Sequence, residues 1–257
     1  MDEKTGLPQS GVLSEKEIRR YIRQIDFAGF GIIGQEKVKK SKILVIGAGG
    51  KGTSVMQNLT TIGVGTLGIC DNYHVTEEQL SRQHLYGDGD LGKQKAIISR
   101  EKLQRINQST EYRLHNVFLT EDNIDLIVSG YNILIDATDN FSAHYLINDA
   151  AVRMNKPFVY GAFDGIKGYV SVFNYKDGPS LRCCYPKSHE KNKSTSKKGF
   201  VCQLTLIDMV GSIMANEVVK IITETDTPLN GNLLAFDVDN YHFSLKAIKK
   251  NPLNFIK

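Results

Sequence analysis

The first part of the chain alternates between short apolar runs and segments with helical periodicity. Residues 42–46 and 66–70 are apolar runs typical of buried parallel strands, and the apolar positions between them recur at the spacing of one helix face. The same rhythm continues, predicting a helix over 91–106, a strand over 112–118, a helix over 121–129, a strand over 132–136, a helix over 141–154 and a strand over 157–160. This repeated spacing predicts an α/β fold, a doubly wound, Rossmann-like and mostly parallel sheet with helices on both faces.

The pattern changes in the second part of the chain. Residues 169–173 alternate between apolar and polar, and a long helical pattern covers residues 203–223. Two further strands are expected over 233–238 and 241–248. These features predict an antiparallel C-terminal extension of the same sheet, with no linker between the two parts.

A glycine-rich loop follows the first predicted strand and opens the next helix. Gly47, Gly49 and Gly52 fit the G-x-G-x-x-G template, in which the glycines allow a tight turn, close approach of a phosphate, and packing of helix on strand. Asp71 ends the following strand, where a carboxylate can accept hydrogen bonds from ribose hydroxyls. We interpret this combination as a site for an adenine nucleotide, against the alternative that the glycines serve packing alone.

We therefore expect a single domain over residues 1–257, organised in three parts. The N-terminal helical arm covers 14–40 and begins with a capping box at Ser14 to Glu17. The nucleotide-binding half covers 41–165. The antiparallel extension covers 166–257 and contains a strongly polar segment at 187–199, which we expect to be mobile.

Composition excludes several other classes of protein. The formal charge is only +4, from 32 Lys+Arg and 28 Asp+Glu, so the chain lacks the basic balance of a dedicated nucleic-acid binder. No apolar run approaches the roughly 18 residues that a membrane helix needs, and the N-terminal residues do not resemble a secretory signal. Four cysteines do not make a disulfide framework. We expect a cytoplasmic protein with no nucleic-acid or membrane partner.

Charged residues downstream of the glycine loop suit the chemistry of a triphosphate. Arg82, Gln83 and Lys95 follow Asp71 in a polar stretch, and the two cations, Arg82 and Lys95, can neutralise phosphate charge. Asp139 follows a buried strand at the sheet edge where open α/β proteins bind ligands, so it is a candidate Mg²⁺ ligand. Taken singly, each would more often be a solvated surface charge, but their joint placement favours a site.

Six segments together resemble the ThiF/MoeB/HesA adenylyltransferases, bacterial relatives of the ubiquitin-activating enzymes. They occur in the order and spacing of that family over about residues 14–250, at 20–24, 47–52, 80–83, 92–95, 136–140 and 211–217. The resemblance implies that the C-terminal carboxylate of a small ubiquitin-like sulfur carrier, such as ThiS or MoaD, attacks the α-phosphate of ATP. The products would be an acyl adenylate and pyrophosphate.

The resemblance also implies roles for individual residues. Arg82 and Lys95 would neutralise phosphate charge in the transition state, and Asp139 would coordinate Mg²⁺. Arg23 corresponds to an arginine that enters the ATP site of the neighbouring subunit, which implies a homodimer. The implied nucleotide-binding set is Gly47, Gly49, Gly50, Gly52, Asp71, Gln79, Arg82, Gln83, Lys95, Asp139 and Asn140.

The chain departs from the family pattern at several positions. Gln79 stands where the family has an asparagine, and Lys51 stands where the fifth loop residue is usually apolar. The sequence leaves open whether Lys51 points to ligand or to solvent. Many relatives hold a structural zinc with two C-x-x-C pairs, but this chain keeps only Cys183 and the adjacent Cys184 there. We expect no structural zinc, and we expect both cysteines to be small buried residues.

A catalytic cysteine is equally doubtful from the sequence. Relatives that form a thioester or pass sulfur carry a cysteine in a loop before the last long helix, a place that falls near residues 195–197 here. Cys202 lies downstream and is the one candidate nucleophile, weighed against an inert residue at the start of the helix. We expect adenylation without an obligatory cysteine.

Three alternatives remain open at the level of sequence. The same chemistry could act on a ribosomally made peptide in a natural-product pathway. The fold and Asp71 would also suit an NAD-dependent oxidoreductase, although the six histidines are scattered and suggest no hydride-transfer site. A catalytically silent scaffold is the third, and the retained Arg82, Lys95 and Asp139 argue against it.

Overall fold

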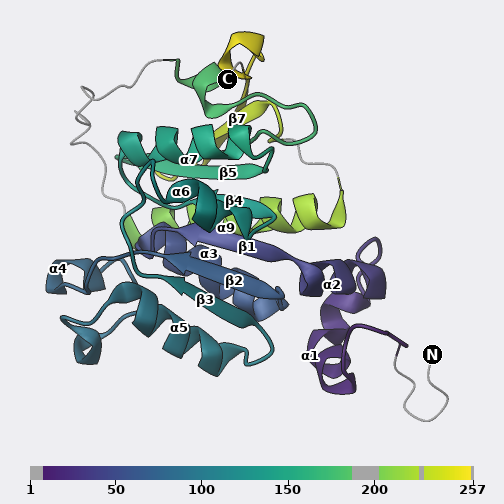
Figure 1. The fold of residues 1–257 in the computed structure, drawn as a ribbon. Helices are drawn as coiled ribbons and strands as arrows, with labels where there is room; N and C mark the ends of the chain where they lie inside the picture. Colours follow the sequence, from purple (N-terminus) through teal and green to yellow (C-terminus); the bar gives the residue numbers. More distant parts are fainter. Residues whose placement is uncertain (1–7, 187–202, 226–228, 256–257) are drawn as a thin grey trace.

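The computed structural model describes residues 8–186, 203–225 and 229–255, in which a twisted eight-stranded sheet runs through the centre (Figure 1). The strand order is β3-β2-β1-β4-β5-β6-β7-β8. Five strands are parallel: β1 (Lys42–Ile46), β2 (Thr66–Cys70), β3 (Glu111–His115), β4 (Ile133–Asp136) and β5 (Phe158–Asp164). Since the chain winds outward from β1 to β3 and then returns beside β1 as β4, the order reverses between β1 and β4. Open sheets bind ligands at such a switch point.

The last three strands extend the sheet in antiparallel fashion. They are β6 (Lys167–Phe173), β7 (Asn232–Asp237) and β8 (His242–Ala247), and each pairs with its neighbour along the chain. The expected fold class, a mostly parallel doubly wound sheet with an antiparallel C-terminal extension, is confirmed. Strand β5 is longer than the predicted 157–160, because it pairs with β6 along its whole length, up to the turn at residues 165–166.

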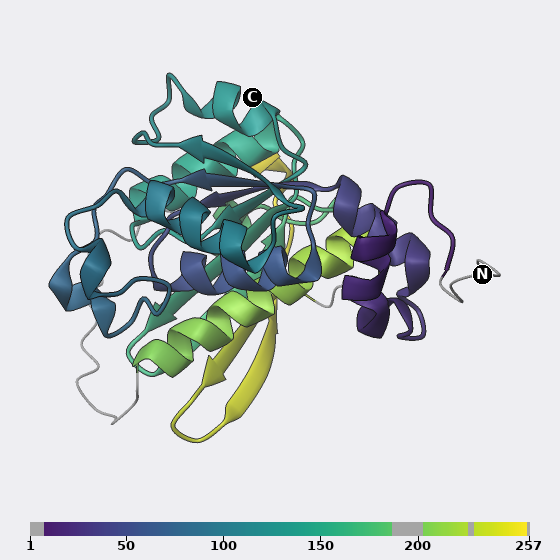
Figure 2. The same cartoon turned by 90° about the horizontal axis from the view of Figure 1, so that it is seen from below.

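Helices cover both faces of the sheet (Figures 1 and 2). Helices α3 (Gly50–Ile62), α5 (Lys95–Ile106) and α9 (Gln203–Thr223) pack on one face, and α6 (Ile124–Ser129) and α7 (Phe141–Arg153) pack on the other. Successive side chains of β1 enter opposite cores: Ile43 and Val45 join the first, Leu44 and Ile46 the second. A parallel strand buried on both faces therefore reads as a continuous apolar run.

The N-terminal arm consists of α1 (Glu15–Ile25) and α2 (Gly31–Lys40). The Ser14 side chain accepts a hydrogen bond from the Glu17 N–H, and the Glu17 carboxylate accepts one from the Ser14 N–H, so the predicted capping box is present. Ile18, Tyr21 and Ile25 form a small core of their own with Leu13. The arm lies at one end of the molecule (Figure 2).

Some predicted boundaries were wrong for identifiable reasons. The helix expected over 91–106 begins at Lys95, because residues 92–93 instead exchange backbone hydrogen bonds with Val75 and Gly92 has a φ of 74°. The strand expected over 112–118 ends at His115. Short helices not foreseen are α4 (Glu77–Leu80), α8 (Leu181–Cys184) and the 3₁₀ turns η1 (Asp88–Asp90) and η2 (Pro252–Phe255).

The segment 187–199, predicted to be mobile, lies outside the described residues. None of the helices within the described ranges is long and apolar enough to cross a membrane.

Candidate functional site

A cavity of about 370 Å³ opens at the carboxyl ends of β1, β2 and β4. It gathers side chains from segments spread over much of the chain. Its lining comprises Gly47, Gly49, Gly50, Lys51, Asp71, Tyr73, Gln79, Arg82, Gln83, Lys95, Ala137, Thr138, Asp139, Asn140, Phe163 and Ile207. Every residue of the predicted nucleotide set except Gly52 lines this one cavity.

The glycine loop owes its shape to two glycines. Gly47 has a φ of 98°, a left-handed conformation that side chains rarely adopt. A Cβ atom at Gly52 would lie 1.9 Å from the Gly47 carbonyl oxygen, so only glycine lets α3 pack this close to the loop. Gly52 therefore shapes the loop from beneath the cavity, as its place in the template predicts.

The N-terminus of α3 faces the cavity with its backbone donors free of a side-chain cap. The N-cap is Gly49, and a Cβ there would meet only the Gln83 amide at 3.8 Å. Free N–H groups and the helix dipole at such an end favour a bound phosphate. Space above Gly49 allows a ligand to reach them.

Asp71 is held in place by the two loops on either side of it. Its carboxylate accepts hydrogen bonds from the Ala48 N–H at 2.7 Å and the Tyr73 N–H at 2.8 Å. Burial raises the pKa of Asp71 above its ordinary value, while these two donors and the charge of Lys95 oppose that shift. The carboxylate lies at the carboxyl end of β2, as the ribose-binding role predicts.

Two cations converge on the same cavity. Lys95 is 4% exposed and occupies the first turn of α5, and Arg82 follows α4 and is partly exposed. Among the described residues, neither side chain makes a hydrogen bond or an ion pair. Burial lowers the pKa of Lys95. The positive charge of Arg82 adds to this shift, whereas the negative charges of Asp71 and Asp139 oppose it. A cavity with two cations that lack partners in the described part of the chain is suited to a polyanion.

The side-chain oxygens of Gln79 and Gln83 also lack partners among the described residues. Each of these oxygens is buried and without a hydrogen bond in the described part of the chain. Buried polar atoms are nearly always satisfied, so a ligand that donates hydrogen bonds to these two oxygens would complete the cavity wall. Gln79, which stands where the family has an asparagine, thus keeps an amide in the cavity wall.

Asp139 stands at the rim of the cavity, just beyond β4, with 72% of its side chain exposed. Within the described ranges, no three His, Cys, Asp or Glu side chains cluster closely enough to hold a metal by themselves. Mg²⁺ is commonly bound by one or two carboxylates together with substrate phosphates and water, so a single carboxylate fits it here. Asn140 also lines the cavity, but its side-chain oxygen caps α7 by accepting the Ala143 N–H at 2.7 Å.

The loop that carries Asp139 rests on a buried carboxylate. Asp136 is fully buried and accepts hydrogen bonds from the Thr138 N–H at 2.9 Å and the Thr138 hydroxyl at 2.7 Å. Its other oxygen lies 2.6 Å from Nδ1 of His144, which is 4% exposed. Burial opposes ionisation of Asp136, but His144, Thr138 and Lys51 together hold its pKa below its ordinary value.

Lys51 does not point to solvent but toward the loop after β4 and strand β5. Its side chain is buried, and its ammonium group donates to the carbonyl oxygens of Thr138 at 2.8 Å and Gly161 at 2.9 Å. It also lies 3.0 Å from Asp139 Oδ1. The question that the sequence left open is therefore answered: Lys51 reaches beneath the Asp139 loop.

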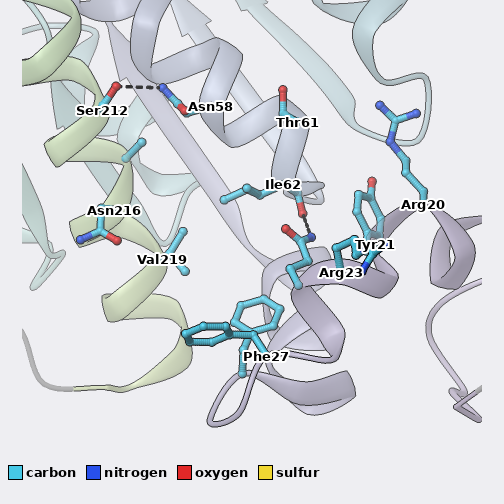
Figure 3. Close-up of a pocket in the computed structure, with 13 residues that line it drawn as sticks. Arg20, Tyr21, Arg23, Phe27, Asn58, Thr61, Ile62, Ser212, Asn216 and Val219 are labelled. Atoms are coloured by element: carbon cyan, nitrogen blue, oxygen red, sulfur yellow. Dashed lines mark hydrogen bonds between the residues drawn. The ribbon is translucent and has the colours of Figure 1, made fainter.

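Arg23 lies outside this cavity. It is exposed on α1, whereas Gln79 is on α4 at the opposite end of the molecule (Figure 1). Arg23 lines a second, larger and mostly apolar cavity of about 630 Å³ between α1, α3 and α9 (Figure 3). The smaller cavity is nevertheless the functional candidate, because only there do the glycine loop, both cations and both carboxylates converge. Arg23 can serve such a site only from another subunit.

The expectation that Cys183 and Cys184 are buried was wrong. Both are of intermediate exposure, because the short helix α8 lies at the surface. Burial alone would raise the pKa of Cys183, but hydrogen bonds from the Asn251 N–H, the Asn254 amide and Ser180 lower it below its ordinary value. Cys202 lies outside the described residues.

Sequence reasoning missed several residues of the cavity wall. Tyr73 was within reach, because it lies two residues after Asp71 at the end of a predicted strand. Phe163 and Ile207 carry no such signal, since they come from the extended end of β5 and the first turns of α9.

Comparison with known proteins identifies the family. The model of the ThiF family matches residues 21–254, nearly the whole chain. The chain belongs to the ThiF family. The assignment made from the six segments is confirmed.

Curated members of the family carry names of one enzyme class. The sulfur carrier protein adenylyltransferase of Thermus thermophilus is 36% identical over 93% of this chain and 90% of its own length. A probable adenylyltransferase/sulfurtransferase MoeZ of Mycobacterium tuberculosis is 35% identical over 95% of this chain and 63% of its own. MOCS3 of Culex quinquefasciatus is named adenylyltransferase and sulfurtransferase. The region that matches this chain covers 51% of the length of that protein.

Solved structures agree with the fold. PaaA superposes with a TM-score of 0.79 and 23% identity, covering 94% of this chain and 86% of its own. MccB of E. coli, solved with ATP, superposes with a TM-score of 0.78 and 20% identity over 91% of this chain and 72% of its own. At this level of identity, the similarity shows the shared fold of the ThiF family and nothing finer.

Proposed function

We propose that this protein is an ATP-dependent adenylyltransferase that activates the C-terminal carboxylate of a ubiquitin-like sulfur-carrier protein. One observation carries the proposal: Arg82 and Lys95, cations without partners in the described residues, share a cavity with the glycine loop and Asp71. The names of the family relatives support the same enzyme class. A triphosphate carries more negative charge than the pyrophosphate of NAD, so two cations beside a phosphate-binding helix end favour ATP over a dinucleotide.

The proposed reaction depends more on neutralisation of phosphate charge than on covalent catalysis by the enzyme. A carboxylate oxygen of the carrier attacks the α-phosphorus of ATP, the new oxygen–phosphorus bond forms, and the bond from that phosphorus to the bridging oxygen breaks. Pyrophosphate departs with the electron pair. Because both reactants are anions, the site must offset their repulsion and hold them in line.

The residues of the cavity can divide this work among them. The backbone N–H groups at the start of α3 and the Arg82 and Lys95 side chains would meet the phosphates, and Asp71 would accept from the ribose hydroxyls. Mg²⁺, when bound at Asp139, would supply further neutralisation of phosphate charge. None of these steps requires a cysteine.

The direct test is ATP–pyrophosphate exchange with purified candidate substrates. A ThiS-like or MoaD-like carrier should stimulate exchange, and the same carrier without its C-terminal glycine should not, because it lacks the reacting carboxylate in its proper place. Stimulation by a short ribosomal peptide instead would move the substrate to the alternative class. Tight NADH binding without ATP binding would overturn the adenylyltransferase proposal.

We further propose that the enzyme works as a homodimer in which Arg23 completes the partner's site. Its exposure on α1, far from its own cavity, supports that arrangement. Arg23→Ala and Arg82→Ala are each expected to lack most exchange activity. Co-expressed together, half of the dimers are mixed and each mixed dimer has one complete site, so about a quarter of wild-type exchange should return.

Complementation is measured by comparing exchange rates of the co-expressed pair with those of each variant alone, at equal total protein. Activity that does not rise above the single variants would contradict a site shared between subunits. Sedimentation of the wild-type protein provides the independent check on its oligomeric state.

We also propose a cytoplasmic location. The cysteines in the described part of the chain, Cys70, Cys183 and Cys184, are all free thiols, which agrees with a reducing compartment.

A further inference from the structure

Lys51 is a buried cation in an unusual position for one. It is the second residue of α3, where the positive end of the helix dipole disfavours an ammonium group. Only 3% of the residue is exposed, and burial of an unpaired charge is costly. Its retention there therefore depends on the groups that surround it.

Those groups offset the cost of burying the ammonium. It donates hydrogen bonds to the Thr138 carbonyl at 2.8 Å and the Gly161 carbonyl at 2.9 Å, and it forms an ion pair with Asp139 Oδ1 at 3.0 Å. The Nζ atom also lies 5.5 Å from the centre of the Phe163 ring. Lys51 thus links the loop after β4 to strand β5 from below.

The partner of Lys51 is the carboxylate that faces the cavity. Asp139 is 72% exposed at the rim, so the ion pair has one buried member and one that a ligand can reach. Without the ammonium, Asp139 would present an uncompensated negative charge to any polyphosphate that enters. With it, the pair is neutral, and Arg82 and Lys95 keep their attraction for the phosphates.

We propose that Lys51 is the built-in counter-cation of Asp139, so that the cavity accepts a nucleoside triphosphate before a metal ion is in place. The inference rests on the proposed function only in taking the ligand to be ATP. Lys51 is a positioning residue in this account, because it acts on the nucleotide through Asp139.

The test is the affinity for ATP measured by calorimetry in EDTA and again in excess MgCl₂. Lys51→Met keeps most of the length of the unbranched side chain and removes its charge, and should weaken metal-free ATP binding about fivefold or more. In MgCl₂ the metal neutralises Asp139, so the loss should stay within about twofold. Lys51→Gln is neutral but can still donate a hydrogen bond to a carbonyl. Because the proposed effect comes from charge, this variant should lose as much metal-free ATP affinity as Lys51→Met.

A double variant isolates the route of the effect. In the Lys51→Met background, Asp139→Asn removes the uncompensated charge and should restore metal-free affinity to within about twofold of wild type. Lys250→Met is the matched control, since Lys250 also pairs with an exposed aspartate, Asp177, and does not line the cavity. It should leave ATP binding unchanged.

Each result has a definite meaning. Unchanged metal-free affinity in both Lys51 variants, or a loss that Asp139→Asn does not reverse, would overturn the counter-cation role and leave the adenylyltransferase proposal intact. If the variants bind ATP as expected but no carrier or peptide stimulates pyrophosphate exchange, the counter-cation role stands and the adenylyltransferase proposal is overturned. Wild-type protein that binds no ATP in either buffer would overturn both. Thermal unfolding of each variant, with Lys51→Gln as the gentler substitution, confirms that folded protein is compared.

Discussion

Replacement of Arg82 by alanine is expected to lower ATP–pyrophosphate exchange by more than about tenfold while the protein stays folded. The side chain lines the cavity and has no partner in the described residues, so the fold does not depend on it. Charge that shifts toward the departing pyrophosphate during transfer is stabilised by a cation already in place. The loss should therefore fall mainly on kcat and less on KM, because the interaction strengthens in the transition state.

Asp139→Ala provides a second route to the same conclusion, with an expected loss of similar size that excess MgCl₂ reduces only in part. Arg105→Ala is the matched control, since Arg105 is an exposed arginine that lies in the last turn of α5 and does not line the cavity. Melting temperatures of Arg82→Ala and Arg105→Ala should match the wild type, whereas that of Asp139→Ala should be lower, because the buried Lys51 loses its counter-charge. Unchanged exchange in both Arg82→Ala and Asp139→Ala would refute the assignment of this cavity as the site of adenylation.

The parts of the site that the sequence predicts well are those written in a continuous stretch. Gly47, Gly49 and Gly52 define one turn by local sterics, and Asp71 ends the next strand, so pattern and position suffice to bring them together. The placement of Arg82 and Lys95 in the site could not be predicted from local pattern alone, because a charged residue on a polar segment is ordinarily solvated. The order and spacing of the family segments supplied that information.

Other features depend on contacts between distant segments, which no local pattern records. Lys51 is oriented by carbonyl groups of Thr138, in the loop after β4, and of Gly161, in the middle of β5. His144 looked like one of six scattered histidines, yet the turn from β4 into α7 sets it against Asp136. The start of α5 was misplaced because a backbone pairing with residues 73–75 competes with the helix. In each case tertiary structure decides between locally equivalent choices.

Asp136→Ala should have the largest effect on stability, about 3–5 kcal/mol, because it removes one partner from a buried pair. The Thr138 N–H, the Thr138 hydroxyl and the buried His144 Nδ1 would all lose their hydrogen-bond partner. Urea unfolding at pH 7 measures the loss. Asp122→Asn, at an exposed position, is the control and should change stability by less than about 0.5 kcal/mol.

The pH dependence of stability follows from the sign of the pKa shift at Asp136. Its folded-state pKa lies below the ordinary value of 3.8, so the folded protein binds the proton less readily than the unfolded chain does. The contribution of the carboxylate to stability is then fully present above the unfolded pKa and is lost as the pH falls through the folded one. Wild type should lose stability between about pH 5 and pH 2 more steeply than Asp136→Asn. Parallel pH curves for the two proteins would show that the carboxylate is not stabilised by the fold.

The same variant connects stability to catalysis. Asp136 holds the backbone N–H and hydroxyl of Thr138 while Lys51 holds its carbonyl, so the residue before Asp139 is fixed on both sides. Asp136→Asn protein that remains folded should therefore exchange pyrophosphate more slowly, although residue 136 does not line the cavity. Exchange at the wild-type rate in folded Asp136→Asn would mean that the Asp139 loop keeps its shape without this support, and that Lys51 alone is enough to fix it.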